Sequence, residues 1–252
     1  MADTVQYTSS GYVGTLILSN PDRHNSLGKR ELDLINGKLQ IIAADPELRV
    51  LVLTGAGDKT FCAGASLDEM NSGAMNGEDY QNMTDSVAAL RIPTICALNG
   101  NVFGGGVELA LSCDFRIGIE GTRMRVPAAA IGLCYPLRGI QRIVHKLGVT
   151  VAQRVLVASE TFSAVEMRRT GIIDQLVTPE EFSETVNRYA TDVAALAPLA
   201  VRAMKSVVQQ AGKGEMDWSG LTEMSEACAN SSDLKEGFSA AAEKRKPTFF
   251  GY

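Results

Sequence analysis

Short apolar runs alternate with amphipathic segments through the first half of the chain. Four runs of aliphatic and β-branched residues, each ended by a turn that contains Gly or Pro, predict buried strands. They cover residues 12–19, 50–54, 94–98 and 115–119. Between the first two runs, apolar residues recur at helical spacing from Leu32 to Ile42 and predict an amphipathic helix. Strands that alternate with helices are typical of a mostly parallel sheet, so the pattern predicts an α/β fold.

The pattern changes after Pro136, where helical periodicity dominates and one further strand signal lies at residues 174–178. Helical patterns cover about residues 137–147, 149–158, 163–170, 180–196, 198–211 and 218–243. We therefore predict two parts, a β/α core at residues 1–195 and a helical C-terminal region at residues 196–252. This helical region has apolar faces but little core of its own, which predicts that it packs against another copy of the chain.

The composition is that of a globular protein, with 252 residues, of which 45% are hydrophobic and 21% charged. The net charge is −5 and the one basic run is Lys244–Lys246, so nucleic-acid binding is disfavoured, because phosphate contacts need clustered cations. No apolar run reaches the ~18 residues that a membrane span needs, and the N-terminus lacks the pattern of a signal peptide. We expect neither nucleic acid nor a membrane as a partner.

The cysteines and histidines predict no metal or disulfide chemistry. Five cysteines are present, an odd number without a CxxC pair, which is typical of reduced thiols in a cytoplasmic protein. The two histidines, His24 and His145, are far apart and lack the spacing of metal ligands.

The most distinctive segment joins the run at residues 94–98 to a helix through three glycines, Gly104–Gly106. Glycines let backbone amides approach a ligand closely, and the start of a helix adds unpaired N–H donors with partial positive charge. Such a site suits an oxygen that becomes negative during a reaction. Glu108 follows in the first turn of a helix that is apolar nearly all round, so we predict a buried, catalytic carboxylate beside this oxygen.

A second loop of small residues, Phe61–Leu67, follows the run at residues 50–54. Ligands gather at the carboxyl ends of parallel strands, so we predict that the Ala65 amide faces the same oxygen as the Gly105 amide. Neither loop reads as a dinucleotide or Walker phosphate loop, because G-x-G-x-x-G and G-x-x-x-x-G-K-[ST] are missing there. Tyr135 precedes Pro136 and is held extended, where it either packs or places its phenol in a cleft.

Together these segments resemble the enoyl-CoA hydratase/isomerase (crotonase) superfamily from about Tyr12 to Tyr252. The matching pieces, in this order, are Ser19–Leu27, Phe61–Leu67, Gly104–Asp114, Gly171–Asp174 and Glu243–Pro247. The resemblance implies an α/β crotonase fold, a ClpP-like spiral of ββα units, with a helical C-terminal trimerisation region. It further implies a homotrimer or a dimer of trimers.

The resemblance also implies an acyl-CoA substrate, with the thioester oxygen in an oxyanion hole made by the amides of Ala65 and Gly105. Glu108 matches a catalytic glutamate of the family. The coenzyme A moiety would bind along a path formed by Arg23, Ala63, Ala65, Leu67, Lys246 and Phe249. Coenzyme A then belongs to the substrate, and we expect no separate cofactor.

Two positions depart from the family's pattern. Hydratases of the family carry a second glutamate about twenty residues after the first, and here Ala128 occupies that position. Ser66 stands where the family usually has an aspartate. Hydration needs a base that orients water and an acid that protonates the α-carbon, so one of these roles lacks its carboxylate. What remains is hydration by Glu108 alone, with water or Tyr135 as the proton donor.

The loop at residues 132–136 offers a second interpretation, because it is similar to the methylmalonyl-CoA decarboxylase branch, which also has a tyrosine there and lacks the second glutamate. Decarboxylation of a malonyl-type thioester would use Tyr135, with Arg125 or Arg138 holding the substrate carboxylate, unless these arginines only lie on the surface. A non-catalytic acyl-CoA-binding homologue is the third alternative. The sequence favours an enzyme that acts through a stabilised enolate, with hydration of a 2-enoyl-CoA first.

Overall fold

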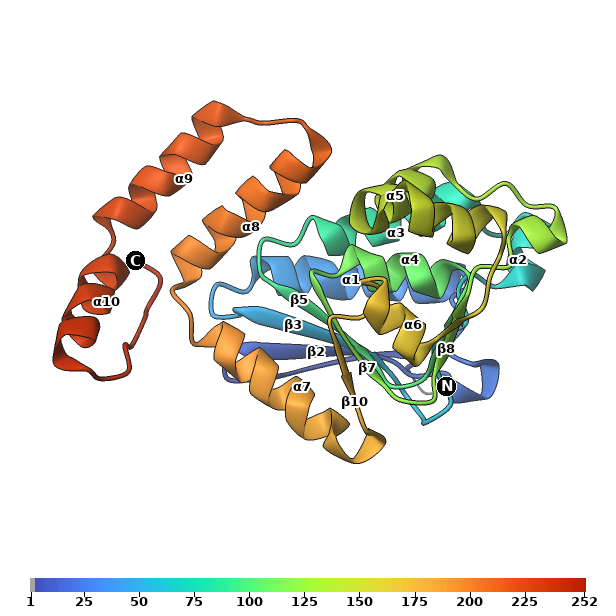
Figure 1. The fold of residues 1–252 in the computed structure, drawn as a ribbon, viewed down its shortest axis with the longest axis horizontal. Helices are drawn as coiled ribbons and strands as arrows, with labels where there is room; N and C mark the ends of the chain where they lie inside the picture. Colours follow the sequence, from blue (N-terminus) through green and yellow to red (C-terminus); the bar gives the residue numbers. More distant parts are fainter. Residues whose placement is uncertain (1–2) are drawn as a thin grey trace.

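A six-stranded sheet lies at the centre of the computed structural model, which describes residues 3–252 (Figure 1). Its strands are, in spatial order, β1 (Val5–Ser10), β2 (Val13–Leu18), β3 (Val50–Gly55), β5 (Thr94–Leu98), β7 (Phe115–Ile119) and β10 (Gln175–Val177). β1 and β2 form an antiparallel hairpin, and all other neighbours in this sheet are parallel. The four strands predicted from apolar runs are β2, β3, β5 and β7, so the α/β prediction is confirmed.

Helices cover both faces of this sheet because its central strands are apolar on both sides. One face packs against α7 (Pro179–Ala194). The buried apolar cluster between this face and α7 contains Val50, Val52, Ile95, Ala97, Ile117, Val186, Ala190 and Ala194. The opposite face is covered by α1 (Lys29–Ala44), α3 (Gly77–Ala88) and α4 (Gly105–Ser112) (Figure 1). In α4 every residue from Gly106 to Ser112 is buried, as the apolar composition of this helix predicts.

A second sheet of very short strands was not predicted from the sequence. Its order is β4 (Thr60–Cys62), β6 (Asn101–Phe103), β8 (Arg123–Arg125) and β9 (Phe162–Ser163). The strands β4, β6 and β8 follow β3, β5 and β7 along the chain, and a helical segment comes next each time. This ββα repeat pairs β4 with β6, which places the loop before α2 (Leu67–Ser72) beside the loop before α4. Strands of two or three residues are too short to show a period of two.

The remaining helices follow the second half of the chain. They are α5 (Leu137–Ala152), α6 (Ala164–Arg169), α8 (Pro198–Lys213), α9 (Trp218–Asn230) and α10 (Ser232–Glu243). The single helical pattern predicted at residues 218–243 is wrong, since Ser231 is extended and its hydroxyl accepts a hydrogen bond from the Leu234 amide as the N-cap of α10. The patterns at residues 137–147 and 149–158 are separated by Gly148, whose φ of 74° breaks the helix.

The boundary drawn at residues 195–196 falls between α7 and α8. Helix α8 is tied to the core by Lys205, whose ammonium group lies 2.6 Å from a carboxylate oxygen of Asp114 and donates to the Ile92 carbonyl at 2.7 Å. Helices α9 and α10 then extend away from the sheet (Figure 1). Within residues 3–252 no helix has the length and apolar character to cross a membrane.

Candidate active site

The two small-residue loops meet at their glycines. A single β-bridge between Leu27 and Ala65 holds the loop at residues 61–67. Leu27 N donates to the Gly64 carbonyl and Ser66 N donates to the Leu27 carbonyl, both at 2.8 Å. A Cβ atom on Gly64 would lie 2.5 Å from the amide nitrogen of Gly105, so only glycine permits this approach. Among residues 3–252, neither the Ala65 nor the Gly105 amide donates to a protein acceptor. Two free N–H donors on touching loops can hold one oxygen between them.

Glu108 lies one turn inside α4 and is 1% exposed. Its Oε1 atom accepts a hydrogen bond of 3.0 Å from the Thr84 hydroxyl on α3. The Arg142 Nε atom on α5 lies 3.9 Å from the same oxygen. Burial raises the pKa of Glu108 above its ordinary value, and the Thr84 hydrogen bond and the Arg142 charge oppose this only in part. A raised pKa suits a carboxylate that both takes and returns a proton near neutral pH.

The other carboxylate oxygen of Glu108 lies against Gly139 and Tyr135. A Cβ atom on Gly139 would come 2.5 Å from Glu108 Oε2 and 2.6 Å from Tyr135 Cε1. The Tyr135 side chain is 8% exposed, and its hydroxyl has no hydrogen-bond partner within residues 3–252. Burial, and then the charge of Glu108, raise the pKa of Tyr135 well above its ordinary value. Tyr135 therefore keeps its proton and presents a donor beside the carboxylate.

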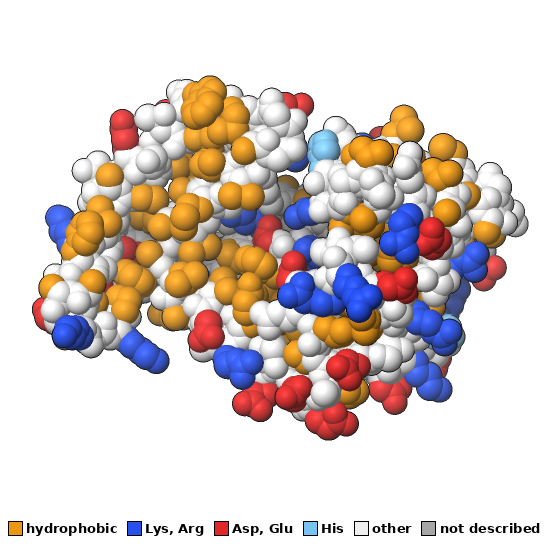
Figure 2. Space-filling model, viewed as in Figure 1, with side chains coloured by type: hydrophobic (Ala, Val, Ile, Leu, Met, Phe, Trp, Pro, Cys, Tyr) orange, Lys and Arg blue, Asp and Glu red, His pale blue; other side chains and the backbone are white. Residues whose placement is uncertain are grey.

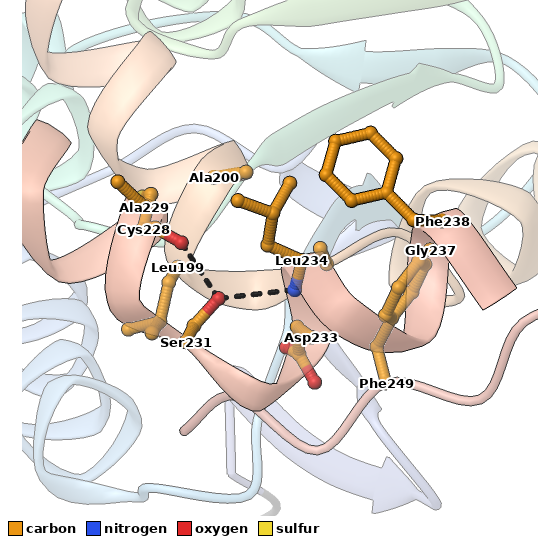
Figure 3. Close-up of a pocket in the computed structure, with 11 residues that line it drawn as sticks. Leu199, Ala200, Cys228, Ala229, Ser231, Asp233, Leu234, Gly237, Phe238 and Phe249 are labelled. Carbon is orange, nitrogen blue, oxygen red and sulfur yellow. Dashed lines mark hydrogen bonds between the residues drawn. The ribbon is translucent and has the colours of Figure 1, made fainter.

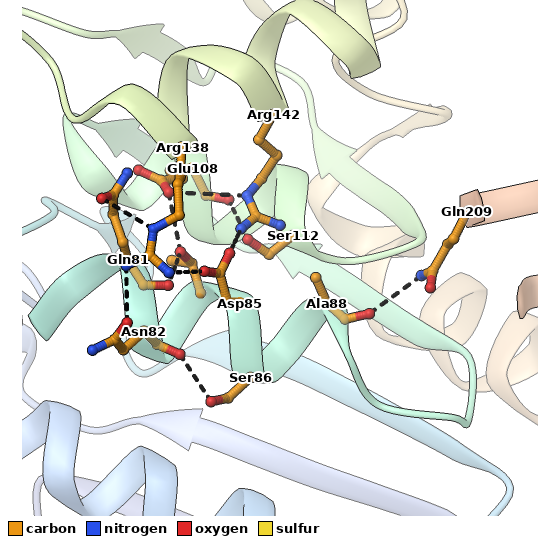
Figure 4. A network of polar contacts seen from close by, with 11 residues as sticks. Gln81, Asn82, Asp85, Ser86, Ala88, Glu108, Ser112, Arg138, Arg142 and Gln209 are labelled. Carbon is orange, nitrogen blue, oxygen red and sulfur yellow. Dashed lines mark hydrogen bonds and ion pairs between the residues drawn. The ribbon is translucent and has the colours of Figure 1, made fainter. Parts of the chain in front are cut away.

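An ion-pair network behind Glu108 joins α3 to α5 (Figure 4). Asp85 accepts hydrogen bonds from both Arg138 and Arg142. Arg138 also donates to the Asn82 side chain at 2.9 Å. These contacts place a cation near Glu108 and hold the two helices that supply its partners. In Figure 4 the arginines descend from α5 toward Asp85 and Glu108.

The two arginines that the sequence offers for a substrate carboxylate already have protein partners. Arg138 binds α3 through Asp85 and Asn82. Arg125 Nε donates to the Ser159 carbonyl at 3.0 Å. The structure thus uses both side chains to join segments of the protein.

The two residues that depart from the family pattern, Ala128 and Ser66, both make local backbone hydrogen bonds. Ala128 is buried, and its carbonyl accepts a hydrogen bond of 2.9 Å from Leu133 N in the loop that leads to Tyr135. The Ser66 hydroxyl accepts from the Glu69 amide as the N-cap of α2, a role that serine fills as well as aspartate does.

The residues predicted to bind coenzyme A fall into two groups. Arg23 is exposed and pairs with Asp68 of α2 at 3.8 Å, and Leu67 at the start of α2 is 62% exposed. Ala63 and Ala65, both partly exposed, lie in the loop before that helix. Lys246 and Phe249 follow α10, with the Phe249 ring close to Gly237. Since α2 and α10 lie at opposite ends of the molecule (Figure 1), a single chain does not bring the two groups together.

Sequence reasoning missed the residues that surround Glu108. They are Tyr80, Thr84, Asp85, Gly139 and Arg142. A helical spacing of Tyr80, Met83, Thr84 and Val87 could have indicated α3. That spacing does not reveal which other helix α3 faces.

Comparisons with known proteins identify the family of the chain. Residues 8–251 match the family described as enoyl-CoA hydratase/isomerase. The chain is 32% identical over 244 residues to crotonyl-CoA hydratase of Syntrophomonas wolfei, covering 94% of each, and 30% identical over 247 residues to short-chain-enoyl-CoA hydratase of Clostridium acetobutylicum, covering 94% and 93%.

A crystal structure of enoyl-CoA hydratase from Bacillus anthracis superposes with a TM-score of 0.90 at 29% identity, covering 99% of this chain and 100% of that one. The match to this structure confirms the crotonase fold, and the family match together with the named relatives shows that the chain is an enzyme of the hydratase/isomerase family. The chain belongs to the enoyl-CoA hydratase/isomerase family.

Proposed function

We propose that this protein hydrates a 2-enoyl-CoA thioester with Glu108 as its single catalytic glutamate. The observation that carries the proposal is that the buried carboxylate of Glu108 and the ring of Tyr135 both lie against Gly139. The relatives named as hydratases of crotonyl-CoA and short-chain enoyl-CoA support the same reaction class. Both a base and a proton donor are thus present although Ala128 replaces the second glutamate.

The reaction follows from these positions. Glu108 takes a proton from a water molecule as the water oxygen bonds to the β-carbon of the substrate. The electron pair of the Cα=Cβ double bond shifts to join the α-carbon and the thioester carbon, and the carbonyl pair moves to the thioester oxygen, where the amides of Ala65 and Gly105 stabilise the enolate. Tyr135 then protonates the α-carbon and regains its proton from Glu108. The raised pKa of Tyr135 drives this return, because a buried phenolate beside Glu108 is unfavourable.

Decarboxylation of a malonyl-type thioester is disfavoured, since Arg125 and Arg138 are engaged by the protein. The test is to incubate the purified protein separately with crotonyl-CoA and methylmalonyl-CoA and to identify the products by mass spectrometry. Gain of water on crotonyl-CoA supports hydration. Loss of carbon dioxide from methylmalonyl-CoA overturns it in favour of a decarboxylase. Binding of both thioesters without turnover favours a non-catalytic binding protein.

We also propose that helices α8–α10 pack against other copies of the chain in a homotrimer or a dimer of trimers. Orange side chains gather over this region in Figure 2. Large apolar residues are exposed there, including Met204 (60%), Val208 (70%), Trp218 (71%) and Phe238 (70%). A cavity of about 390 Å³ between these helices is lined mostly by apolar side chains such as Leu199, Leu234 and Phe238 (Figure 3). Exposed apolar surface of this kind marks a protein interface.

If one coenzyme A moiety contacts both groups of predicted residues, Lys246 and Phe249 must come from a different copy than Arg23 and Leu67, because one chain holds them at opposite ends. Light scattering after size-exclusion chromatography measures the mass directly. Three or six times the 26.9 kDa chain supports the proposal, and a stable monomer contradicts it.

A further inference from the structure

Tyr80 carries a buried hydroxyl group that the proposed reaction does not use. The side chain comes from α3 and is 4% exposed, and within residues 3–252 its hydroxyl makes no hydrogen bond to oxygen or nitrogen and neighbours only the Cys62 sulfur, a weak acceptor. Burying a hydroxyl without a strong partner is unfavourable, so such a group calls for a physical explanation. Phenylalanine would fill the same space without that cost. The hydroxyl is therefore the feature to be explained, not the ring.

The position of Tyr80 points to the oxyanion hole. Its ring packs on the α-carbon of Gly105, because a Cβ atom there would lie 2.6 Å from Tyr80 Cζ and 2.9 Å from the hydroxyl oxygen. Gly105 supplies one of the two free amides that face the predicted thioester oxygen. The polar end of Tyr80 thus lies beside Gly105, whose free amide faces the predicted thioester oxygen.

The protonation state of Tyr80 fits a donor. Burial raises the pKa of Tyr80 well above its ordinary value, and the neighbouring Cys62, Tyr135 and Glu108 add to this rise. Burial also raises the pKa of the Cys62 thiol to about 12, so this neighbour of Tyr80 is neutral near pH 7. Tyr80 accordingly presents an O–H group that keeps its proton.

We propose that the Tyr80 hydroxyl is a third hydrogen-bond donor to the acyl oxygen that the amides of Ala65 and Gly105 face. This inference rests on the proposed acyl-CoA function of the site. The bond strengthens as the oxygen becomes an enolate, because hydrogen bonds to a charged acceptor are stronger than those to a neutral one. No bond to Tyr80 is formed or broken in this role, and its proton stays on the phenol. Tyr80 is then distinct from Tyr135, which supplies a proton to carbon.

The test uses acetoacetyl-CoA, whose enolate absorbs in the ultraviolet and whose binding requires no turnover. The apparent pKa of the bound thioester is measured by spectrophotometric titration for the wild type, Tyr80→Phe and Tyr189→Phe. Tyr189 is the control because it packs against Phe115 on the α7 side of the sheet, away from the oxyanion hole. We expect Tyr80→Phe to raise the apparent pKa of the bound ligand by about one to two units, and Tyr189→Phe to leave it unchanged.

Turnover and stability provide further measurements. Tyr80→Phe should lower kcat about a hundredfold with a small change in KM, as the loss of one oxyanion donor does. The same variant should unfold at an equal or higher temperature than the wild type, because an unpaired buried hydroxyl has been removed. A purely structural tyrosine would change neither the ligand pKa nor kcat.

The outcomes separate this inference from the proposed function. Tight binding of acetoacetyl-CoA with the same ligand pKa in the wild type and Tyr80→Phe overturns the role of Tyr80 alone. A pKa difference in a protein that turns over no enoyl-CoA supports Tyr80 and overturns hydration. Failure of the wild type to bind acetoacetyl-CoA overturns both.

Discussion

The chemistry of Glu108 is set by the few residues that touch its two oxygens. Thr84 and Arg142 lie at Oε1, while Gly139 and Tyr135 lie at Oε2. The first pair favours the ionised carboxylate and burial opposes it. The carboxylate is thereby held by contacts on both of its oxygens and is 1% exposed.

Substitution of Glu108 by glutamine tests its role as a base. Glu108→Gln keeps the shape of the side chain and can still accept from Thr84, but it cannot take a proton from water. We expect kcat to fall by about 10²–10⁴-fold with little change in the affinity for an acyl-CoA, measured by steady-state kinetics and calorimetry. Wild-type turnover in this variant would exclude Glu108 as the base.

A methyl group on Gly139 tests the contact between Glu108 and Tyr135. In Gly139→Ala the added carbon would lie 2.5 Å from Glu108 Oε2, so the carboxylate must move. We expect kcat to fall by about a hundredfold and stability to drop.

The control for this substitution is Gly37→Ala in α1, where a Cβ atom meets nothing within 4 Å. It should leave turnover unchanged and raise the free energy of unfolding by up to about 1 kcal/mol, because alanine is the better helix former. Equal behaviour of the two variants in kinetics and chemical denaturation would contradict the predicted clash.

At the scale of elements, α4 is held between α3 and α5, and each of the three contributes to one site. Helix α3 supplies Thr84 and Asp85, and helix α5 supplies Gly139 and Arg142. Asp85 binds two arginines of α5 and so fixes the spacing of these helices. Its charge also contributes to the raised pKa of Glu108.

The pH dependence of activity tests this coupling. A base works only when deprotonated, so kcat/KM falls as the pH drops through the pKa of Glu108, which burial places above the ordinary 4.5. Asp85→Asn removes a negative charge and leaves Arg142 free to approach Glu108, and both effects lower that pKa. We expect the acidic limb of the pH profile of kcat/KM to move to lower pH.

The matched control is Asp33→Asn, which removes an exposed carboxylate of α1 that pairs with Lys29. It should leave the acidic limb in place. A limb that moves to higher pH in Asp85→Asn, or stays where it is, would contradict the coupling.

At the scale of the whole molecule, the C-terminal helices leave apolar surface uncovered while the core is closed around two clusters. Assembly would bury that surface. A charged residue at the interface is then costly, because a desolvated charge without a partner is unfavourable.

The substitution Val208→Asp on α8 tests the assembly. Val208 is 70% exposed in one chain, and we expect the variant to have a lower mass by light scattering than the wild type at the same concentration. Ile41→Asp on α1, where the side chain is 58% exposed outside the C-terminal region, is the control and should keep the wild-type mass. A Val208→Asp protein of unchanged mass would argue against an interface at α8.

How far the sequence predicts the site differs between its parts. The glycines of both loops, the apolar helix around Glu108 and four strands of the main sheet each leave a local signal of period or composition. The positions of Thr84 and Arg142 leave none, because Thr84 reaches Glu108 across 24 residues of chain and Arg142 reaches Asp85 across 57. Tyr80 reads as one more apolar position of α3, and its contact with Gly105 becomes visible only in three dimensions.

By itself the sequence determined the α/β class, the burial of Glu108 and the glycines at which the two loops meet, since these depend on hydrophobic periodicity and on glycine in short loops. Only the tertiary structure decided which side chains meet the two oxygens of Glu108 and how α3 and α5 close around α4. Those contacts depend on the packing of helices that are distant in the chain, and no local pattern encodes the rotation of one helix against another.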